Sequence, residues 1–326
     1  MSDESNKPKI VVAERLSASA MARLEAAGAV VVLEECDEPA LIAAVADADA
    51  LVVRTYAKVT AAVIEAAAGG PLKVIGRAGV GVDNIDLPAA AKAGIPVVHT
   101  PASCTYAVAD LVVGLIIALQ RGILPADARL RAGEFKQLRL EIPLRSELQY
   151  QTLGVIGMGR IGRAVSTRLH HGFGMRIIYH DIREVGWLPF AAESKPNHEA
   201  VYAEADVVTM HVPLTASTRG MIDAKALGHF KKGSFLFNTS RGPVVEAQPL
   251  ADALNEGRLA GAAIDVFSPE PPPPDHPLRS APNCILTPHI ASRSKEGVAA
   301  MHDVVEDVIA VLEGREPTYQ ADPALS

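Results

Sequence analysis

The chain has 326 residues, of which 49% are hydrophobic and 21% are charged, and its formal net charge is -7. This length favours two domains with separate cores, and the composition is that of a soluble globular protein. No stretch concentrates Lys and Arg, so nucleic acid and anionic membranes are poor candidates for partners.

Three further features argue against a membrane, secreted or zinc-binding protein. The polar start, MSDESNKPKI, lacks the apolar centre of a signal peptide, and the apolar run at 111–119 is too short to span a membrane. We therefore expect a cytoplasmic protein. Cys36, Cys104 and Cys284 lie far apart without a CxxC pair, so we expect neither a disulfide framework nor a metal site.

Short β-branched runs alternate with alanine-rich runs over the first hundred residues. Strands are expected at 9–14, 29–35, 50–55, 72–79 and 96–100, and helices at 17–28, 39–48, 61–70 and 87–94. Strands that are apolar throughout and separated by helices indicate a parallel sheet covered on both faces. This region should therefore form one α/β unit.

A long helix is expected from near Thr105 to residue 122. Because it is apolar almost all round, we expect it to be buried between layers. Residues 135–151 look irregular. Further strands, with helices between them, are then expected at 152–156, 175–181, 205–213, 234–240, 259–267 and 284–291. This pattern predicts a second parallel sheet.

Two segments near the end of the chain have other patterns. The proline-rich run 268–277 can be neither a regular helix nor a central strand, which indicates a rigid surface loop. Residues 295–314 are helical again, and chain order does not say on which domain they pack.

A glycine-rich turn follows the strand at 152–156. Gly157, Gly159 and Gly162 form GxGxxG between that strand and a helix, where they permit a tight turn, close approach of a pyrophosphate and close helix–strand packing. Asp181 stands nineteen positions after Gly162, at the end of the next strand, which is the spacing of a carboxylate that binds ribose hydroxyls. This carboxylate favours NAD over NADP, although nearby Arg183 could accommodate a 2'-phosphate.

Three charged residues follow later strands of the same predicted sheet. Arg241, Glu270 and His289 each could be an ordinary surface or packing residue. Ligands bind at the carboxyl ends of strands in open parallel sheets, however, and all three residues stand at such ends. We therefore expect them to form one catalytic group.

Several motifs, in order and spacing, resemble the D-isomer-specific 2-hydroxyacid dehydrogenase family over essentially the whole chain. They are GVIGMGRIG at 154–162, HVPLTAST at 211–218, FNTSRGPVV at 237–245, GAAIDVFSPEP at 261–271 and LTPHIAS at 286–292. The resemblance implies two Rossmann-like, doubly wound parallel-sheet domains. A discontinuous, flavodoxin-like substrate domain would comprise 1–101 and 293–326, and 102–292 would be an inserted NAD-binding domain.

The resemblance also assigns roles to the charged residues. His289 would give a proton to the carbonyl oxygen of a 2-oxo acid while a hydride from the nicotinamide reaches its carbon. Glu270 would favour the charged imidazole, and Arg241 would bind the substrate carboxylate and polarise the carbonyl. Asp265 would orient the nicotinamide carboxamide, with strand-end capping as its structural alternative.

Other residues match family positions that line the cofactor or the substrate. Those at the cofactor would be Thr105, Gly157, Gly159, Arg160, Ile161, Gly162, Asp181, His211, Pro213, Thr218, Thr239, Ser240, Arg241, Asp265, His289, Ala291 and Ser292. Those at the substrate would be Arg54, Ala78, Gly79, Val80, Arg241 and His289. Arg54 would suit a phosphate or another second anionic group, and no metal is expected.

The resemblance leaves the substrate open. Residues 52–60 and 76–90 are similar to phosphoglycerate dehydrogenases, whereas 100–119 is closer to glyoxylate and hydroxypyruvate reductases. Many phosphoglycerate dehydrogenases have asparagine and glutamate where this chain has Cys104 and Asp110. Reductases of that type often use NADPH, whereas Asp181 favours NAD. A homodimer is also implied, with the helix from Thr105 as a plausible contact.

Two alternatives keep the same fold. A nucleotide-sensing corepressor could share the Arg, Glu and His, and the absence of an added interaction tail argues against it. A formate dehydrogenase of this family places glutamine opposite the histidine, so Glu270 disfavours it.

Overall fold

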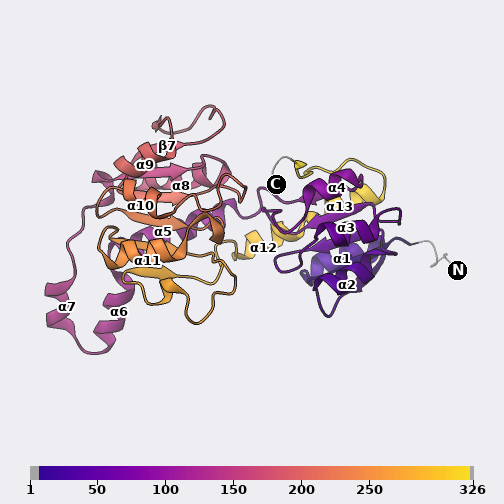
Figure 1. Cartoon of the computed structure of the whole chain (residues 1–326), viewed down its shortest axis with the longest axis horizontal. Coiled ribbons are helices and arrows are strands. Elements are labelled where there is room, and N and C mark those ends of the chain that lie inside the picture. Colours follow the sequence, from indigo (N-terminus) through magenta and orange to yellow (C-terminus); the bar gives the residue numbers. More distant parts are fainter. Residues whose placement is uncertain (1–6, 324–326) are drawn as a thin grey trace. The chain divides into compact units, whose positions relative to one another are not determined.

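The computed structural model describes residues 7–323, and the chain divides into two compact α/β units (Figure 1). The discontinuous unit comprises Met1–Cys104 and Arg293–Ser326, and the continuous unit comprises Thr105–Ser292. The predicted fold class of two doubly wound parallel-sheet domains is confirmed, because each unit contains one wholly parallel sheet.

The discontinuous unit has a five-stranded sheet in the order β2-β1-β3-β4-β5, the flavodoxin-like order expected from the resemblance. Its strands are β1 (Lys9–Val12), β2 (Ala29–Val32), β3 (Ala50–Val53), β4 (Val74–Arg77) and β5 (Val97–His99). The expectation that every strand is covered was wrong for β2, in which Val31 and Val32 are exposed. An edge strand has one neighbour and less cover, and its apolar sequence does not reveal that position.

Within the described residues, the helices of this unit are α1 (Ala18–Ala27), α2 (Glu38–Val45), α3 (Ala61–Ala67), α4 (Leu87–Lys92), α12 (Lys295–His302) and α13 (Val304–Leu312). One core joins Ile10, Leu24 and Val308, and the other joins Val11, Leu41 and Ile64. Adjacent Ile10 and Val11 enter opposite cores because successive strand side chains point to opposite faces. The C-terminal segment thus belongs to the first unit, where α13 packs on the sheet and α12 packs on α13, which chain order had not decided.

The continuous unit has a seven-stranded sheet in the order β12-β11-β10-β9-β6-β7-β8. Its strands are β6 (Thr152–Ile156), β7 (Arg176–His180), β8 (Ala192–Ser194), β9 (Val207–Met210), β10 (Phe235–Asn238), β11 (Gly261–Ile264) and β12 (Cys284–Leu286). The chain runs outward from β6 to one edge and returns to β9 on its other side. This reversal creates a topological switch point, where ligands of such sheets bind.

The helices of this unit are α5 (Thr105–Gln120), α6 (Ile123–Arg131), α7 (Phe135–Glu141), α8 (Arg160–Phe173), α9 (His198–Glu204), α10 (Ala224–His229) and α11 (Ala247–Asn255). Short 3-10 turns are η2 (Leu148–Tyr150), η3 (Gly242–Val244) and η4 (Pro277–Arg279). The predicted helix from Thr105 is α5, which packs on α8. It buries Val112 and Ile116 but exposes Tyr106 and Asp110, so the expected burial holds for one face of the helix and not for the other.

Residues 135–151 are also more regular than expected, since they contain α7 and η2. In Figure 1, α6 and α7 project from the body of the continuous unit. Within residues 7–323, no single helix is long and apolar enough to cross a membrane; α5 and α6 pass such a test only as a pair bent by 59°. The three cysteines form no disulfide.

Candidate active site

The glycine-rich turn lies between β6 and α8, at the switch point of the seven-stranded sheet. Gly157 has a φ of +91°, and a Cβ there would collide with the carbonyl oxygen of His211. A Cβ on Gly162 would likewise collide with the carbonyl oxygen of Gly157, whereas a Cβ on Gly159 would meet nothing within 4 Å. Gly159 also gives α8 no side-chain cap. The turn therefore presents open space and uncapped helix amides, which suit a pyrophosphate.

Asp181 connects this turn to the loop after β7. Its Oδ2 accepts a hydrogen bond from the Met158 amide at 2.8 Å, and its Oδ1 accepts one from the Arg183 amide at 2.9 Å. Neighbouring Arg160 and the Arg183 side chain are exposed, while Ile161 is half-buried in the first turn of α8. The acid predicted from spacing thus lies against the glycine turn.

The loop after β9 carries His211, Pro213 and Thr218. Burial lowers the pKa of His211 to about 3, and its Nε2 lies 3.0 Å from the hydroxyl of buried Thr209. Thr218 is buried and donates its hydroxyl to the Pro213 carbonyl at 2.6 Å. Thr218 therefore shapes the loop that carries exposed Pro213.

The loop after β10 carries Thr239, Ser240 and Arg241. Ser240 donates to Asn238 Oδ1 at 2.7 Å, and Asn238 donates to the Arg241 carbonyl at 2.9 Å, so this buried amide fixes the turn. The hydroxyl oxygen of Thr239 is buried without a hydrogen-bond partner among the described residues. Thr239 follows a strand of the same sheet as the glycine turn, and a bound cofactor would supply a hydrogen-bond partner for its hydroxyl.

Asp265, directly after β11, fixes the segment that follows β12. Its side chain is 0% exposed, and it accepts hydrogen bonds from the Thr287 hydroxyl and from the amides of Ile290 and Ala291 at 2.6–2.9 Å. The Asp265 carbonyl also accepts the His289 amide at 2.8 Å. Three of the four acceptor positions of this carboxylate are thus used within the protein. Asp265 therefore caps backbone amides at a strand end, which is the structural alternative that the sequence offered for it.

His289 and Glu270 form the pair expected from the sequence. His289 Nδ1 and Glu270 Oε1 lie 2.7 Å apart, and both side chains are about one-third exposed. His289 has a φ of +52°, an unusual conformation for a non-glycine residue that Asp265 stabilises through the surrounding turn. Because Glu270 occupies Nδ1, Nε2 is the ring nitrogen available to a substrate.

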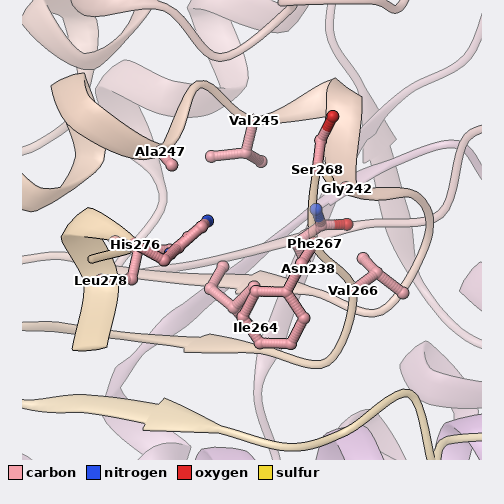
Figure 2. A pocket seen from close by; sticks show the side chains of 10 residues that line it. All are labelled: Asn238, Gly242, Val245, Ala247, Ile264, Val266, Phe267, Ser268, His276 and Leu278. Carbon is pink, nitrogen blue, oxygen red and sulfur yellow. The ribbon is translucent and has the colours of Figure 1, made fainter. Parts of the chain in front are cut away.

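Arg241 lies on a turn that packs against the loop leading to Glu270. The next residue, Gly242, is so close to the Phe267 backbone that a Cβ would collide with it. A cavity of about 20 Å³, enough for one water molecule, lies between the two loops (Figure 2). Asn238, Gly242, Phe267, Ser268 and buried His276 are among its lining residues. The Arg241 turn and the Glu270 loop therefore form one packed region.

The predicted substrate residues Arg54, Ala78, Gly79 and Val80 all belong to the discontinuous unit. Gly79 has a φ of +146°, and the Thr100 amide donates to its carbonyl at 3.1 Å. His99 Nδ1 lies 2.8 Å from the Val80 carbonyl, and Ala78 donates to the Val53 carbonyl. This loop after β4 is thus held by its neighbours on both sides. Arg54 directly follows β3.

The other predicted positions lie at segment ends. Thr105 begins α5, and Ala291 and Ser292 end the continuous unit beyond the His289 turn. At the two positions that depart from the phosphoglycerate dehydrogenase pattern, Cys104 is buried and Asp110 pairs with Arg168 at 2.7 Å. Among residues 7–323, no group of three His, Cys, Asp or Glu side chains could hold a metal ion.

Sequence reasoning missed residues that hold the predicted groups in place. Thr287 and His276 belong to the continuous unit, and Glu14 and Asn84 contact the loop that begins with Arg54. Glu14 offered one signal, since it is an acid just beyond the carboxyl end of the first strand. The others bind through tertiary contacts for which their sequence neighbours give no indication.

A glycine turn, an acid after the next strand and an acid–imidazole pair in the same parallel sheet define a dinucleotide-dependent enzyme. A family model described as D-isomer specific 2-hydroxyacid dehydrogenase, NAD binding domain, matches residues 113–291. Glyoxylate reductase from Thermofilum pendens is 40% identical over 322 residues, covering 95% of this chain and 93% of the relative.

Two other relatives represent different branches. D-3-phosphoglycerate dehydrogenase from Methanocaldococcus jannaschii is 41% identical over 94% of this chain, which spans 58% of that longer relative. The solved NADPH-dependent glyoxylate/hydroxypyruvate reductase from Sinorhizobium meliloti, in complex with NADP and malonate, has a TM-score of 0.87 and 32% identity, and 98% of each chain is covered.

This chain therefore belongs to the D-isomer specific 2-hydroxyacid dehydrogenase family. It is an NAD-dependent oxidoreductase of small 2-hydroxy and 2-oxo acids.

Proposed function

We propose that the chain reduces a small 2-oxo acid of the glyoxylate, hydroxypyruvate or phosphohydroxypyruvate type to the 2-hydroxy acid with NADH, giving the D-isomer where the product is chiral, or catalyses the reverse oxidation. The observation that carries this proposal is the 2.7 Å contact between His289 and Glu270 in the sheet that also holds the glycine turn. In this proposal residues 1–101 and 293–326 form the substrate domain, and 102–292 form the NAD-binding domain.

The residues of the continuous unit fit a bound NAD. The amide of Gly159 and the uncapped amides at the start of α8 would hold the pyrophosphate, and Asp181 would bind the adenosine ribose hydroxyls. A 2'-phosphate would meet the Asp181 carboxylate, so we expect a preference for NAD over NADP. When bound, the nicotinamide supplies or accepts the hydride at the substrate carbon.

His289 supplies the proton in reduction. As hydride reaches the carbonyl carbon, the carbonyl oxygen gains charge, and the proton on His289 Nε2 moves to that oxygen to form the hydroxyl. Glu270 holds the imidazole at Nδ1 and stabilises its positive charge before the transfer. In oxidation the same nitrogen takes the proton back.

The substrate carboxylate needs fixed donors and a positive charge. Arg241 can supply a planar guanidinium for two parallel hydrogen bonds, and it can polarise the carbonyl oxygen. The amides around Gly79 and Val80 would bind the same carboxylate. Arg54 would bind a phosphate or another second anionic group.

We also propose a homodimer in the cytoplasm, without nucleic acid or membrane as a partner. Although α5 was the first candidate contact, α6 and α7 expose more apolar surface. Ile123, Leu124, Leu130, Phe135 and Leu140 are exposed there, and Leu140 is 87% exposed. Such a surface is typical of a covered interface. Light scattering should show a dimer that Leu140→Glu combined with Phe135→Glu converts to a monomer; a wild-type monomer would contradict this proposal.

The test of function is a spectrophotometric screen of 2-oxo and 2-hydroxy acids with NADH, NADPH and NAD. We expect NADH oxidation with at least one of glyoxylate, hydroxypyruvate and phosphohydroxypyruvate, and a higher kcat/KM for NADH than for NADPH. Tight NADH binding without turnover of any 2-oxo acid would instead support the corepressor alternative. NAD reduction by formate alone would support the formate dehydrogenase alternative.

A further inference from the structure

Glu14 accepts hydrogen bonds from the backbone amides of the loop that begins with Arg54. It lies just beyond β1, and the loop 54–57 begins just beyond β3, the parallel neighbour of β1. Glu14 Oε2 accepts hydrogen bonds from the amides of Arg54, Tyr56 and Ala57 at 2.9, 3.2 and 3.1 Å. Its Oε1 accepts from the amides of Thr55 and Tyr56 at 3.1 and 3.2 Å. Four consecutive amides thus converge on one carboxylate.

A second side chain holds the same loop. Asn84 donates from Nδ2 to the carbonyls of Ala57 at 2.8 Å and Arg54 at 3.2 Å. Glu14 therefore accepts hydrogen bonds from the loop amides, and Asn84 donates hydrogen bonds to the carbonyls of the first and last residues of the loop. Fixing both kinds of backbone group defines the position and direction from which the Arg54 side chain leaves the chain.

The charge of Arg54 is not neutralised by an ion pair within the described residues. Its Nη1 donates to the Arg15 carbonyl at 3.1 Å, and the oxygens of Glu14 accept hydrogen bonds from backbone amides. Arg15 is exposed and likewise makes no ion pair in the part of the chain that the structure describes. A half-buried guanidinium without a carboxylate partner is suited to an anion from outside the chain.

His302 adds a polar group near Arg54. It is 4% exposed, its Nδ1 accepts the Ser17 amide at 3.0 Å, and its Nε2 is buried without a hydrogen-bond partner among residues 7–323. Burial first, and the charge of Arg54 second, lower the pKa of His302. The lowered pKa and the hydrogen bond that Nδ1 accepts from Ser17 both favour the neutral ring.

We propose that Glu14 is a positioning residue for Arg54, and that this clamp selects 2-oxo acids carrying a second anionic group, such as a phosphate. The proposal rests on the proposed function, in which Arg54 binds that group. Glu14 does not touch the substrate. It fixes the loop backbone, so that Arg54 loses less conformational freedom when the anion binds, which strengthens binding without changing the chemical step.

Steady-state kinetics with NADH on hydroxypyruvate and phosphohydroxypyruvate test this proposal, because these substrates differ by one phosphate. We expect Glu14→Gln to raise the KM for phosphohydroxypyruvate about tenfold, with kcat and the KM for hydroxypyruvate within about twofold of wild type. Arg54→Ala should act in the same direction and at least as strongly. Glu34→Gln is the matched control, since this exposed glutamate lies in the same unit and loses the same charge.

The double variant shows whether Glu14 acts through Arg54. If it does, adding Glu14→Gln to Arg54→Ala raises the KM no further, because the two changes remove one interaction. Additive effects, equal KM increases for both substrates or a lower kcat for both would overturn the proposal. If Glu14→Gln does not fold, Asn84→Ala replaces it, with the same substrate-dependent change in KM expected and the same outcomes counting against it.

Binding measurements separate this proposal from the proposed function. If wild type oxidises NADH with no 2-oxo acid, the proposed function fails, and calorimetry with 3-phosphoglycerate and D-glycerate decides the role of Glu14. A loss of about tenfold in 3-phosphoglycerate affinity alone on Glu14→Gln would support the clamp. Unchanged affinity, or no binding of 3-phosphoglycerate to wild type, would overturn it.

Discussion

Each unit contains a carboxylate beyond one strand that holds the segment following a neighbouring strand, and the two differ in burial and in the group they hold. Asp265 is 0% exposed and holds the turn that carries His289. Glu14 is half-buried and holds the loop that carries Arg54. Both accept mainly backbone amides, so both act on chain geometry.

Similar carboxylate–amide contacts can therefore support the chemical step in the continuous unit and the choice of substrate in the discontinuous unit. A fully buried carboxylate that loses its donors has no water to replace them, so the Asp265 turn cannot loosen without a large cost. Water can replace part of the hydrogen bonding of Glu14. We therefore expect damage to the Asp265 turn to affect every substrate, and damage to the Glu14 loop to affect only substrates that use Arg54.

The largest effect should come from the group that the Asp265 turn carries. His289→Phe should lower kcat by about two to four orders of magnitude for every 2-oxo acid, because the proton donor is lost. NADH oxidation measures this, and NADH fluorescence checks that cofactor binding persists. His198→Phe is the control: His198 also lies beside a glutamate, with 3.2 Å between its Nε2 and Glu199 Oε1, but on α9. Near-normal turnover in His289→Phe would exclude its acid role.

Breaking the Asp265 turn itself should have the next largest effect. Asp265→Asn places an NH2 group where the carboxylate now accepts amides, so at least one buried donor loses its partner at a cost of about 1–3 kcal/mol. We expect a lower melting temperature and a kcat reduced about tenfold or more for both hydroxypyruvate and phosphohydroxypyruvate. If only phosphohydroxypyruvate were affected, the distinction between the two carboxylates would fail.

Changing the glycine turn should weaken cofactor binding. Gly157→Ala introduces a methyl group at a φ of +91° and against the His211 carbonyl, so we expect NADH affinity to fall about tenfold or more. Gly172→Ala is the control, because that helical glycine has open space around its Cβ position. Fluorescence titration with NADH compares them. Equal affinities in the two variants would contradict the role of the turn.

The smallest effect concerns pH and the continuous unit. The pKa of His211 is about 3 in the folded protein and near 6.5 when unfolded, so the unfolded chain binds more protons between these values. Stability should therefore fall as pH decreases below about 6.5, by at most about 1.4 kcal/mol per pH unit from this residue. His211→Gln should lose less stability between pH 7 and pH 5 than wild type in urea unfolding, whereas exposed His229→Gln should follow wild type. Parallel curves for all three proteins would disprove this contribution.

The sequence predicted features that depend on local pattern or on spacing along the chain. Alternating apolar runs predicted both parallel sheets, and strand ends predicted the site edge at which His289 and Glu270 meet across nineteen positions. The exposure of β2 was not predicted, because it depends on which elements cover the strand. The helix α7 was not predicted, because its apolar pattern is weak.

The residues that hold the site in place were harder to predict. Glu14 acts on a loop forty residues away, and Thr287 acts on an acid twenty-two residues before it. Both contacts exist because parallel strands bring distant chain segments to one edge. A family motif identifies the residues that contact the substrate. The residues that hold them in place, such as Glu14 and Thr287, depend on the register between strands, which a single sequence does not specify.

The central claim is that this chain transfers a hydride between nicotinamide and the second carbon of a 2-oxo acid to give the D-isomer. Reduction of hydroxypyruvate with NADH deuterated at the transferred C4 position tests this claim directly, with the product resolved by chiral chromatography and mass spectrometry. The predicted product is D-glycerate with one deuterium at the second carbon. L-glycerate, or D-glycerate without deuterium, would contradict it.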